Sequence, residues 1–380
     1  MFNSKYLAEN ISKFRKNKKL SQANLADMLN VSPQSVSKWE CGVSVPDVEN
    51  LCLLSEILGV TIDALLEHCA EQKKVMIGVD GGGTKTQFML FTEDGNILDN
   101  IKLDACNPNT VGIQASIDVL TRGITTLMTT NPNISGIFIG SAGFLLGNNS
   151  VQIMSALRKS FPHIKMDCAS DMLNIAASAL EDDSCCIAGI CGTGSSILIK
   201  QYDKLTRLSG YGYLLSKSGS GYDIGRDALY AAMCDIDGYG ESTALTPLIQ
   251  AKLGKSISDI IDKVYKNNAA FTASLAQIVF ECYRKGDNIS TKIITENAKA
   301  LADVINFAHK KNPNITNAVI SGGIITQNED FAQLVRDFLN PNLNLIVPTC
   351  YPILGACMLC AKMCNINTTG LLKKLQEHYR

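Results

Sequence analysis

Two glycine-rich turns hold the residues whose types and spacing are best suited to chemistry. The first turn has the sequence DGGGTKT from Asp80 to Thr86, and the second has the sequence CGTGSS from Cys191 to Ser196. Each lies between two apolar segments that predict a strand on either side. Because glycine has no Cβ, the backbone N–H groups of such a turn can approach a phosphate closely. The carboxylate of Asp80 can hold a hydrated Mg²⁺. An ordinary tight hairpin is the alternative interpretation.

The first turn differs from two common nucleotide-binding motifs. The P-loop spacing G-x-x-x-x-G-K-[ST] is absent. A strand is also expected after the turn, whereas P-loops and dinucleotide-binding fingerprints continue into a helix. A third glycine pair, Gly322-Gly323, follows a predicted strand at 318–320, and Gly355 lies in the last apolar segment, which predicts a helix.

Composition limits the classes of protein that can carry these turns. The chain has 380 residues, of which 46% are hydrophobic and 19% charged, so it holds more than one domain and is not globally disordered. Its net charge is −1, and any nucleic-acid contact must therefore come from a local basic patch. The N-terminus has no apolar signal region and no apolar run reaches about 18 residues. We therefore expect a cytoplasmic protein that does not contact a membrane.

The 14 cysteines are scattered through apolar segments, which favours free thiols in a reducing compartment. Cys357, Cys360 and Cys364 are spaced in a way that superficially suggests a metal site. Three ligands on one predicted helix cannot close a tetrahedral site, and no nearby His supplies a fourth. Packing of small side chains is the favoured interpretation.

Residues 1–69 predict short helices with tight turns. Ser21 and Ser32 are placed to cap two of them, and Pro33 suits the first position of the second. Two short helices joined by a tight turn form a unit whose second helix can enter a DNA major groove, and here the second helix would expose amide and hydroxyl groups. Basic residues within 1–20 supply a local positive patch: Lys5, Lys13, Arg15, Lys16, Lys18 and Lys19. A small helical bundle with a solvated charged face is the alternative.

The segment LSQANLADMLNVSPQSVSKWECGVSVPDVENLCLLSEILGVTIDALL resembles the Cro/CI (XRE-type) helix-turn-helix family along its whole length. The resemblance implies that Gln22 anchors a DNA phosphate and that Gln34, Ser35 and Lys38 read DNA. Such modules usually bind two half-sites, so we also expect a homodimer.

From residue 75 onward, the order of glycine-rich segments resembles the sugar kinase/Hsp70/actin ATPase superfamily. The closer resemblance is to the BadF/BadG/BcrA/BcrD ATPase family, which includes N-acetylglucosamine kinases. It rests on the segments GVDGGGTKT, DMLNIAASAL, GICGTGSS, GYGYLL…GSGYDIG, ISGGI and PILGAC. The resemblance implies an α/β fold with two ribonuclease-H-like lobes and ATP with Mg²⁺ in the cleft between them.

The expected domains follow from these two resemblances. The helix-turn-helix domain covers 1–69 and a linker covers 70–74. Lobe I is expected at 75–182 and lobe II at 183–354, with C-terminal helices at 355–380 returning to lobe I.

Asp171 is the candidate catalytic base. It follows a predicted strand at 164–169 and precedes a helix expected to begin near Met172, which resembles the place of the catalytic Asp in hexokinases and N-acetylglucosamine kinases. Phosphoryl transfer to a sugar hydroxyl requires a carboxylate near the attacking oxygen. The position suits a helix N-cap Asp equally well, so both roles stay open.

The resemblance also implies roles for the glycine-rich segments. Asp80 would organise Mg²⁺, and Gly322 and Gly323 would lie against the adenosine. Asn107 and Gly212 would contact the sugar, although Asn107 can also be a turn residue before Pro108. The phosphates would be surrounded by Gly82, Gly83, Thr84, Lys85, Gly192, Thr193, Gly194 and Ser195.

One segment departs from the family pattern. Where N-acetylglucosamine kinases carry G-D-E-G-S, this chain reads Ser216-Lys217-Ser218-Gly219-Ser220, and the nearby Trp is Tyr211. Lys217 only donates hydrogen bonds, so it suits a carboxylate-bearing or phosphorylated sugar better than a neutral one.

We expect a DNA-binding regulator with an ATP-dependent kinase domain for an amino sugar or related sugar. A regulator that senses sugar or nucleotide without catalysis is the alternative. A metabolic kinase whose N-terminal helices serve protein contacts is a third interpretation.

Overall fold

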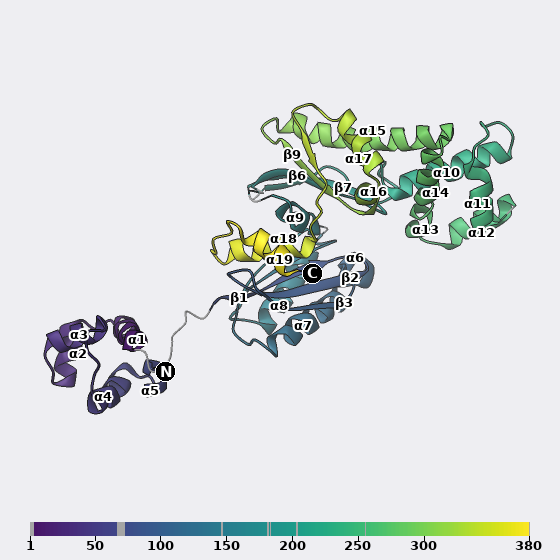
Figure 1. Ribbon diagram of the computed structural model, residues 1–380. Coiled ribbons are helices and arrows are strands. Elements are labelled where there is room, and N and C mark those ends of the chain that lie inside the picture. The colour runs from purple at the N-terminus through teal and green to yellow at the C-terminus, as the bar shows by residue number, and fades with distance from the viewer. Residues whose placement is uncertain are drawn as a thin grey trace. The chain divides into compact units, whose positions relative to one another are not determined.

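The computed structural model describes residues 4–66, 73–145, 147–180, 182, 184–202, 204–254 and 256–379. The chain divides into two compact units, Met1–Lys73 and Lys74–Arg380 (Figure 1). Residues 70–72 of the expected linker 70–74 lie outside the described residues. No helix in the described part of the chain is both long and apolar enough to cross a membrane.

The N-terminal unit is a bundle of short helices. They are α1 (Ser4–Asn17), α2 (Gln22–Leu29), α3 (Pro33–Glu40), α4 (Val48–Leu58) and α5 (Ile62–Leu66). The expected caps at Ser21 and Ser32 are confirmed, because each side chain accepts a hydrogen bond from a backbone N–H one turn later. Asn30 adopts a left-handed conformation with φ 56° and ends α2. The buried face includes Leu25, Val36 and Trp39, which fixes α2 and α3 against the other helices.

The second unit begins with a five-stranded sheet in the order β3-β2-β1-β4-β5. Its strands are β1 (Val75–Gly81), β2 (Lys85–Thr92), β3 (Ile97–Asp104), β4 (Ile134–Ser141) and β5 (Lys165–Ala169). The first three strands form an antiparallel meander, and β4 and β5 run parallel to β1. The helices of this lobe are α6 (Pro108–Val111), α7 (Ile113–Met128), α8 (Asn149–Ser160) and α9 (Asp171–Ala177).

A second five-stranded sheet repeats this plan in the order β10-β9-β6-β7-β8. Its strands are β6 (Cys185–Cys191), β7 (Ser195–Gln201), β8 (Lys204–Arg207), β9 (Asn317–Ser321) and β10 (Asn344–Ile346). Here too an antiparallel meander is extended by two parallel strands. Both glycine-rich turns therefore join the first two strands of equivalent meanders. The predicted α/β class with two ribonuclease-H-like lobes is confirmed.

Most of the helices after β8 pack with the second sheet around one large core (Figure 1). They are α10 (Gly221–Ile236), α11 (Leu245–Leu253), α12 (Ile257–Lys266), α13 (Ala269–Ala273), α14 (Ala276–Arg284), α15 (Asn288–Lys311), α16 (Gly323–Gln327) and α17 (Glu329–Phe338).

The last helices, α18 (Pro352–Met363) and α19 (Leu371–His378), belong to the core that contains β1 and α9. Contact is close on both sides of α18. A Cβ on Gly78 would lie 2.8 Å from the backbone nitrogen of Cys357, and a Cβ on Gly355 would lie 1.8 Å from the carbonyl oxygen of Asn174. Cys357 and Cys360 are buried in this contact as small core residues.

Candidate active site

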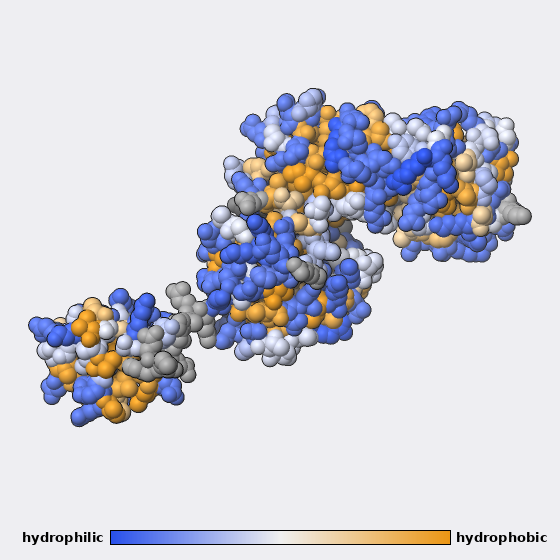
Figure 2. Space-filling view, viewed as in Figure 1, coloured by the Kyte–Doolittle hydropathy of each residue, from blue (hydrophilic) through white to orange (hydrophobic). Residues whose placement is uncertain are grey.

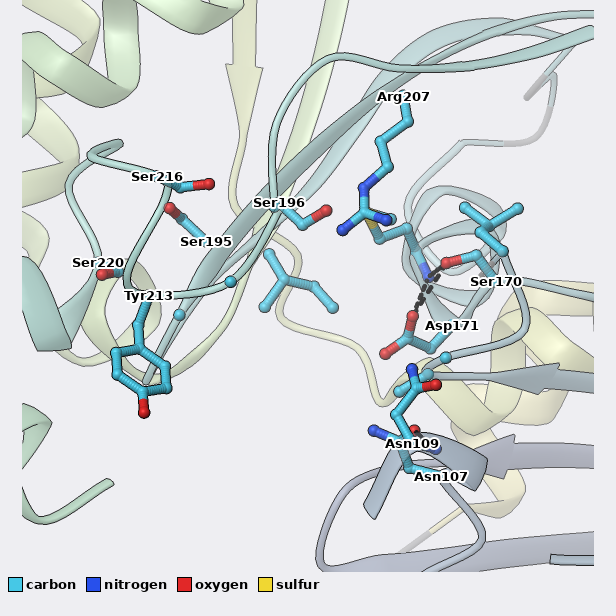
Figure 3. Close-up of a pocket in the computed structure, with 18 residues that line it drawn as sticks. Asn107, Asn109, Ser170, Asp171, Ser195, Ser196, Arg207, Tyr213, Ser216 and Ser220 are labelled. Carbon is cyan, nitrogen blue, oxygen red and sulfur yellow. Dashed lines mark hydrogen bonds between the residues drawn. The ribbon is translucent and has the colours of Figure 1, made fainter. Parts of the chain in front are cut away.

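Asp171 is the first residue of α9. Ser170 precedes it as the N-cap, so the interpretation of Asp171 as the cap is wrong. The Ser170 hydroxyl and the backbone N–H of Met172 each donate to Oδ1 of Asp171 across 3.0 Å (Figure 3). These bonds hold the carboxylate at the start of the helix. Burial raises the pKa of Asp171, and the two hydrogen bonds oppose that rise.

Asp80 lies near the end of β1 and is held by the same helix. The side-chain amide of Asn174, on α9, donates to Oδ1 of Asp80 across 2.8 Å. Burial raises the pKa of Asp80 from 3.8 to about 6, the Asn174 hydrogen bond opposes the rise, and the charge of Asp171 adds to it. One short helix therefore positions the candidate base and supports the candidate metal ligand.

A first cavity of about 410 Å³ opens at Asp171 (Figure 3). The predicted residues Asn107, Asp171, Gly194, Ser195 and Gly212 all line it. It is thus lined from both lobes. Its other lining residues are Asn109, Ala142, Gly143, Leu145, Ser170, Met172, Ile190, Ser196, Arg207, Gly210, Tyr213, Ser216 and Ser220. Asn107 is also the N-cap of α6, with its side-chain oxygen accepting from the backbone N–H of Asn109 across 3.0 Å.

A second cavity of about 680 Å³ is also lined by residues of the β6–β7 turn. The predicted residues Gly192, Thr193 and Gly323 line it. The remaining lining residues are Gly221, Ala270, Ala273, Ser274, Ala276, Gln277, Phe280, Glu281, Arg284, Ile324, Gln327 and Asn328. Consecutive residues of one glycine-rich turn therefore face two different cavities.

In the N-terminal unit, Gln34 and Lys38 on α3 are exposed, as a DNA-reading role requires. Ser35 is half-buried, and its hydroxyl lies 2.9 Å from that of Ser32. The amide of Gln22 donates to Glu40 across 2.7 Å, which leaves a second N–H on the same nitrogen.

One residue of the expected basic patch is placed differently. Arg15 is buried and forms a two-pronged ion pair with Glu40, with N–O distances of 2.6 and 2.8 Å. It therefore does not add to an exposed positive surface. The burial of Glu40 acts to raise its pKa, but the hydrogen bonds from Arg15 and Gln22 prevail and hold it below its usual value.

The sequence pattern of the BadF/BadG/BcrA/BcrD ATPase family matches residues 77–360. The chain belongs to this family. It is 31% identical over 284 residues to an N-acetylmuramic acid/N-acetylglucosamine kinase from Clostridium acetobutylicum, covering 71% of this chain and 91% of the relative. A crystal structure of a proposed N-acetylglucosamine kinase from Porphyromonas gingivalis shares the fold, with a TM-score of 0.60 and 19% identity. That match covers 75% of this chain and 97% of the other.

Residues 11–65 match the helix-turn-helix family pattern. The HTH-type transcriptional activator BcrR from Enterococcus faecalis is 43% identical over 58 residues, which cover 15% of this chain and 28% of the relative. The protein therefore joins a helix-turn-helix regulator domain to a sugar-kinase-like domain of the BadF/BadG/BcrA/BcrD ATPase family.

The ATPase-family unit has residues that fit ATP and Mg²⁺. A Cβ on Gly83 or on Gly194 would meet no atom within 4 Å, so both glycine-rich turns are open to a ligand. The backbone oxygens of Gly192 and Thr193 accept from the first two N–H groups of α10, across 2.8 and 3.0 Å, which fixes the second turn. Asp80 offers the carboxylate oxygen that Mg²⁺ prefers, alongside water and phosphate ligands.

Several predicted residues of the ATPase-family unit line neither cavity: Asp80, Gly82, Gly83, Thr84, Lys85, Gly322 and Lys217. Gly83, Thr84 and Lys85 are exposed at the β1–β2 turn. Gly322 takes a φ of 113°, and a Cβ there would lie 2.5 Å from the carbonyl oxygen of Cys191, so the residue sets the close approach of β9 to β6.

Lys217 is held by a carboxylate of its own lobe. Its Nζ lies 3.5 Å from Oδ2 of Asp227, and its side chain is 52% exposed. The next residue, Ser218, lies 2.5 Å from Ser195, hydroxyl to hydroxyl. The segment 216–220, which departs from the family pattern, therefore contacts the β6–β7 turn. The contact expected between Lys217 and a sugar stays a prediction.

The sequence analysis missed two polar residues of the candidate active site, Asn174 and Arg207. Asn174 could have been found, because it lies three residues after Asp171 and shares its helical face. Arg207 carried no such signal, since it ends a four-residue strand outside every quoted motif.

Proposed function

We propose that this protein is a cytoplasmic, DNA-binding transcriptional regulator whose second unit phosphorylates an amino sugar with ATP and Mg²⁺. The observation that carries the proposal is the position of Asp171. Its carboxylate lines the first cavity together with Gly194 and Ser195 of the glycine-rich turn, and that turn continues into the second cavity. A sugar in the first cavity would meet a phosphate held at the turn.

The chain's own residues would divide the work as follows. Asp171 accepts the proton of the attacking sugar hydroxyl, and its hydrogen bonds from Ser170 and Met172 keep the carboxylate in place. The two glycine-rich turns hold the phosphates, and Gly322 and Gly323 lie against the nucleoside. Asp80 holds the metal, with Asn174 fixing the carboxylate. When bound, ATP supplies the phosphoryl group and Mg²⁺ neutralises its charge.

The substrate class comes from the first cavity and the kinase relative. The relative from Clostridium acetobutylicum is named for N-acetylmuramic acid and N-acetylglucosamine. Amide and hydroxyl groups at Asn107, Ser196 and Ser216 line the cavity, and the backbone of Gly212 lies beside them. These groups suit the hydroxyls and the acetamido group of an amino sugar.

DNA binding would use the exposed face of α3, with Gln34, Ser35 and Lys38 reading DNA and Gln22 at a phosphate. Val43 and Val45 in the α3–α4 loop are exposed by 73 and 47%, and Val48 at the start of α4 is exposed by 78%. Hydrophobic side chains are visible on the surface of this unit in Figure 2. Exposed apolar side chains of this kind support a homodimer. Ligand binding to the second unit would change DNA affinity if it favours one arrangement of the dimer.

The alternative is a regulator that senses its ligands without phosphotransfer. It is favoured by Lys217, which replaces an acidic family residue and is neutralised by Asp227 rather than by an active-site group. ADP release separates the two functions, because both include nucleotide and sugar binding.

The test is coupled ADP release with neutral, amino and acidic sugars, comparing the wild type with Asp171→Asn. The kinase predicts sugar-dependent turnover that falls by at least about a thousandfold in Asp171→Asn. Asp118→Asn, an exposed Asp on α7, is the matched control and should keep full turnover. Absence of turnover in a protein that is stabilised by ATP and sugar would establish the sensor instead.

A further inference from the structure

The first cavity contains one side-chain cation among the described residues that line it. Arg207 ends β8, and the carboxylate of Asp171 is the other formally charged group in the lining. Figure 3 shows the guanidinium of Arg207 extending into the cavity near Ser196 and Ser170. Most of the other polar groups in the lining are neutral amides and hydroxyls.

The guanidinium is oriented by contacts that leave most of its donors available. Its Nε donates to the carbonyl oxygen of Ser209 across 2.9 Å, and its central carbon lies 5.2 Å from the centre of the Tyr211 ring. Within the described residues, no hydrogen bond or ion pair is made by its two Nη groups. An Arg held in this way presents a planar fork of N–H groups, which matches the geometry of a carboxylate.

Two acidic residues of the same lobe, Asp223 and Asp227, have other partners. Oδ2 of Asp223 accepts from Ser220 and from the backbone N–H of Ser218. Asp227 pairs with Lys217 and with Arg226. Lys217 is therefore a paired cation outside the cavity, whereas Arg207 lies in the cavity lining and forms no ion pair with a described carboxylate. A half-buried cation of this kind favours a ligand that carries an anion.

We propose that Arg207 is a specificity-determining residue that binds the carboxylate of an acidic amino sugar. The inference rests on the proposed function and deepens it, because it names the substrate class as an amino sugar with a carboxylate substituent. It also assigns to Arg207 the preference for an acidic ligand that the sequence had suggested for Lys217. A contact between Arg207 and the transferred phosphoryl group is the competing role.

The experiment measures binding in the absence of ATP, by calorimetry on the full chain. The probes are N-acetylglucosamine, N-acetylmuramic acid (the same sugar with a lactyl carboxylate) and the methyl ester of N-acetylmuramic acid. The wild type should bind the acid at least tenfold more tightly than the ester. Arg207→Gln should lose roughly 10- to 100-fold in affinity for the acid and change less than about threefold for N-acetylglucosamine.

Two further variants keep the result interpretable. Arg207→Lys retains the charge but loses the fork, so its affinity for the acid should fall between those of the wild type and Arg207→Gln. Arg122→Gln removes an exposed Arg of α7 and should leave both affinities unchanged. The melting temperature of each variant reports whether it folds.

The outcomes that overturn the proposal are distinct from those that overturn the proposed function. Three outcomes would exclude Arg207 as the carboxylate ligand. The wild type could bind the acid and the ester equally, or Arg207→Gln could keep the wild-type affinity for the acid. The selectivity for the acid could also be lost in Lys217→Gln instead. Selectivity that is unchanged in Arg207→Gln while sugar-dependent ADP release falls for both sugars would assign Arg207 to the phosphoryl group. Binding of no amino sugar by the wild type would reject the proposed substrate class and this inference together.

Discussion

Asn174 donates a hydrogen bond to Asp80 across 2.8 Å, from a helix whose first residue is Asp171. The amide of Asn174 also lies within 3.4 Å of the carbonyl oxygens of Val79 and Gly140. Asn174 thereby ties the start of α9 to the ends of two adjacent strands. A Cβ on Gly140 would lie 2.1 Å from the Asn174 side-chain oxygen, so the contact depends on a glycine in β4.

Asn174→Ala should weaken both the fold and the metal site. It removes the hydrogen bond that favours the ionised form of Asp80 and the two longer contacts to the carbonyl oxygens of Val79 and Gly140. We expect a loss of about 1–3 kcal/mol in the free energy of unfolding and weaker binding of Mg²⁺–ATP. Urea unfolding and calorimetry measure the two effects. Asn288→Ala, at an exposed position of α15, is the control. Unchanged stability and nucleotide affinity would show that Asn174 does not support Asp80.

Asp80 should make the unliganded protein less stable as the pH rises. Its pKa is about 6 in the folded state against an ordinary value of 3.8. Between these values the folded state holds more protons than the unfolded state, so the free energy of unfolding falls with rising pH. The shift corresponds to at most about 3 kcal/mol, lost between about pH 4 and pH 6.

Comparison with Asp80→Asn isolates this effect from the titration of Asp171. Urea unfolding of both proteins between about pH 4 and pH 7 should give curves whose difference changes across this window. The variant should lack that part of the slope. Parallel curves would mean that Asp80 titrates at its ordinary pKa in the folded protein.

The exposed face of α3 should carry DNA recognition. Gln34→Ala is expected to weaken binding to the cognate operator by about 1–3 kcal/mol and to relax its sequence preference. Lys38→Ala should lower affinity and reduce the dependence on salt concentration. Electrophoretic mobility shifts with operator DNA at several salt concentrations measure the affinity of each variant and its salt dependence. Gln114→Ala and Lys292→Ala, exposed in the second unit, are matched controls. If both α3 variants bind like the wild type, α3 is not the reading helix.

Glu40→Ala should loosen the helix-turn-helix domain. The substitution leaves Arg15 as a buried cation without its two-pronged partner and removes the acceptor of Gln22. Breaking a buried ion pair in this way costs about 3–5 kcal/mol. Hydrogen exchange in the full chain should become faster in α1, α2 and α3, while the second unit is unaffected. Glu56→Ala, exposed on α4, should leave exchange unchanged. Equal protection of the backbone amides from exchange in Glu40→Ala and Glu56→Ala would contradict a stabilising role for the Arg15–Glu40 ion pair.

The sequence predicted the features that depend on local patterns. Apolar segments on both sides of DGGGTKT and of CGTGSS predicted two hairpins, and both are present as β1–β2 and β6–β7. Ser21 and Ser32 cap the helices that their positions indicated. Strand bounds were close, since the strand expected at 318–320 is β9, Asn317–Ser321. These features need few long-range contacts, which is why spacing and residue type suffice.

Side-chain partners from distant parts of the chain could not be predicted in this way. Arg15 reads as one member of a basic patch, but its partner Glu40 lies 25 residues away on another helix. Arg207 enters the cavity because β8 ends beside the β6–β7 turn, a result of sheet order rather than of any motif. The capping of α9 by Ser170 instead of Asp171 is a shift of one residue, which capping preferences alone do not resolve.

The β6–β7 turn lines two cavities with consecutive residues, since Thr193 lines the second and Gly194 lines the first. An occupant that displaces this backbone on one side therefore alters the shape of the space on the other. Such a displacement would couple the two occupancies, and any coupling between two binding sites is thermodynamically reciprocal. The factor by which the first occupant changes the affinity for the second equals the factor by which the second changes the affinity for the first.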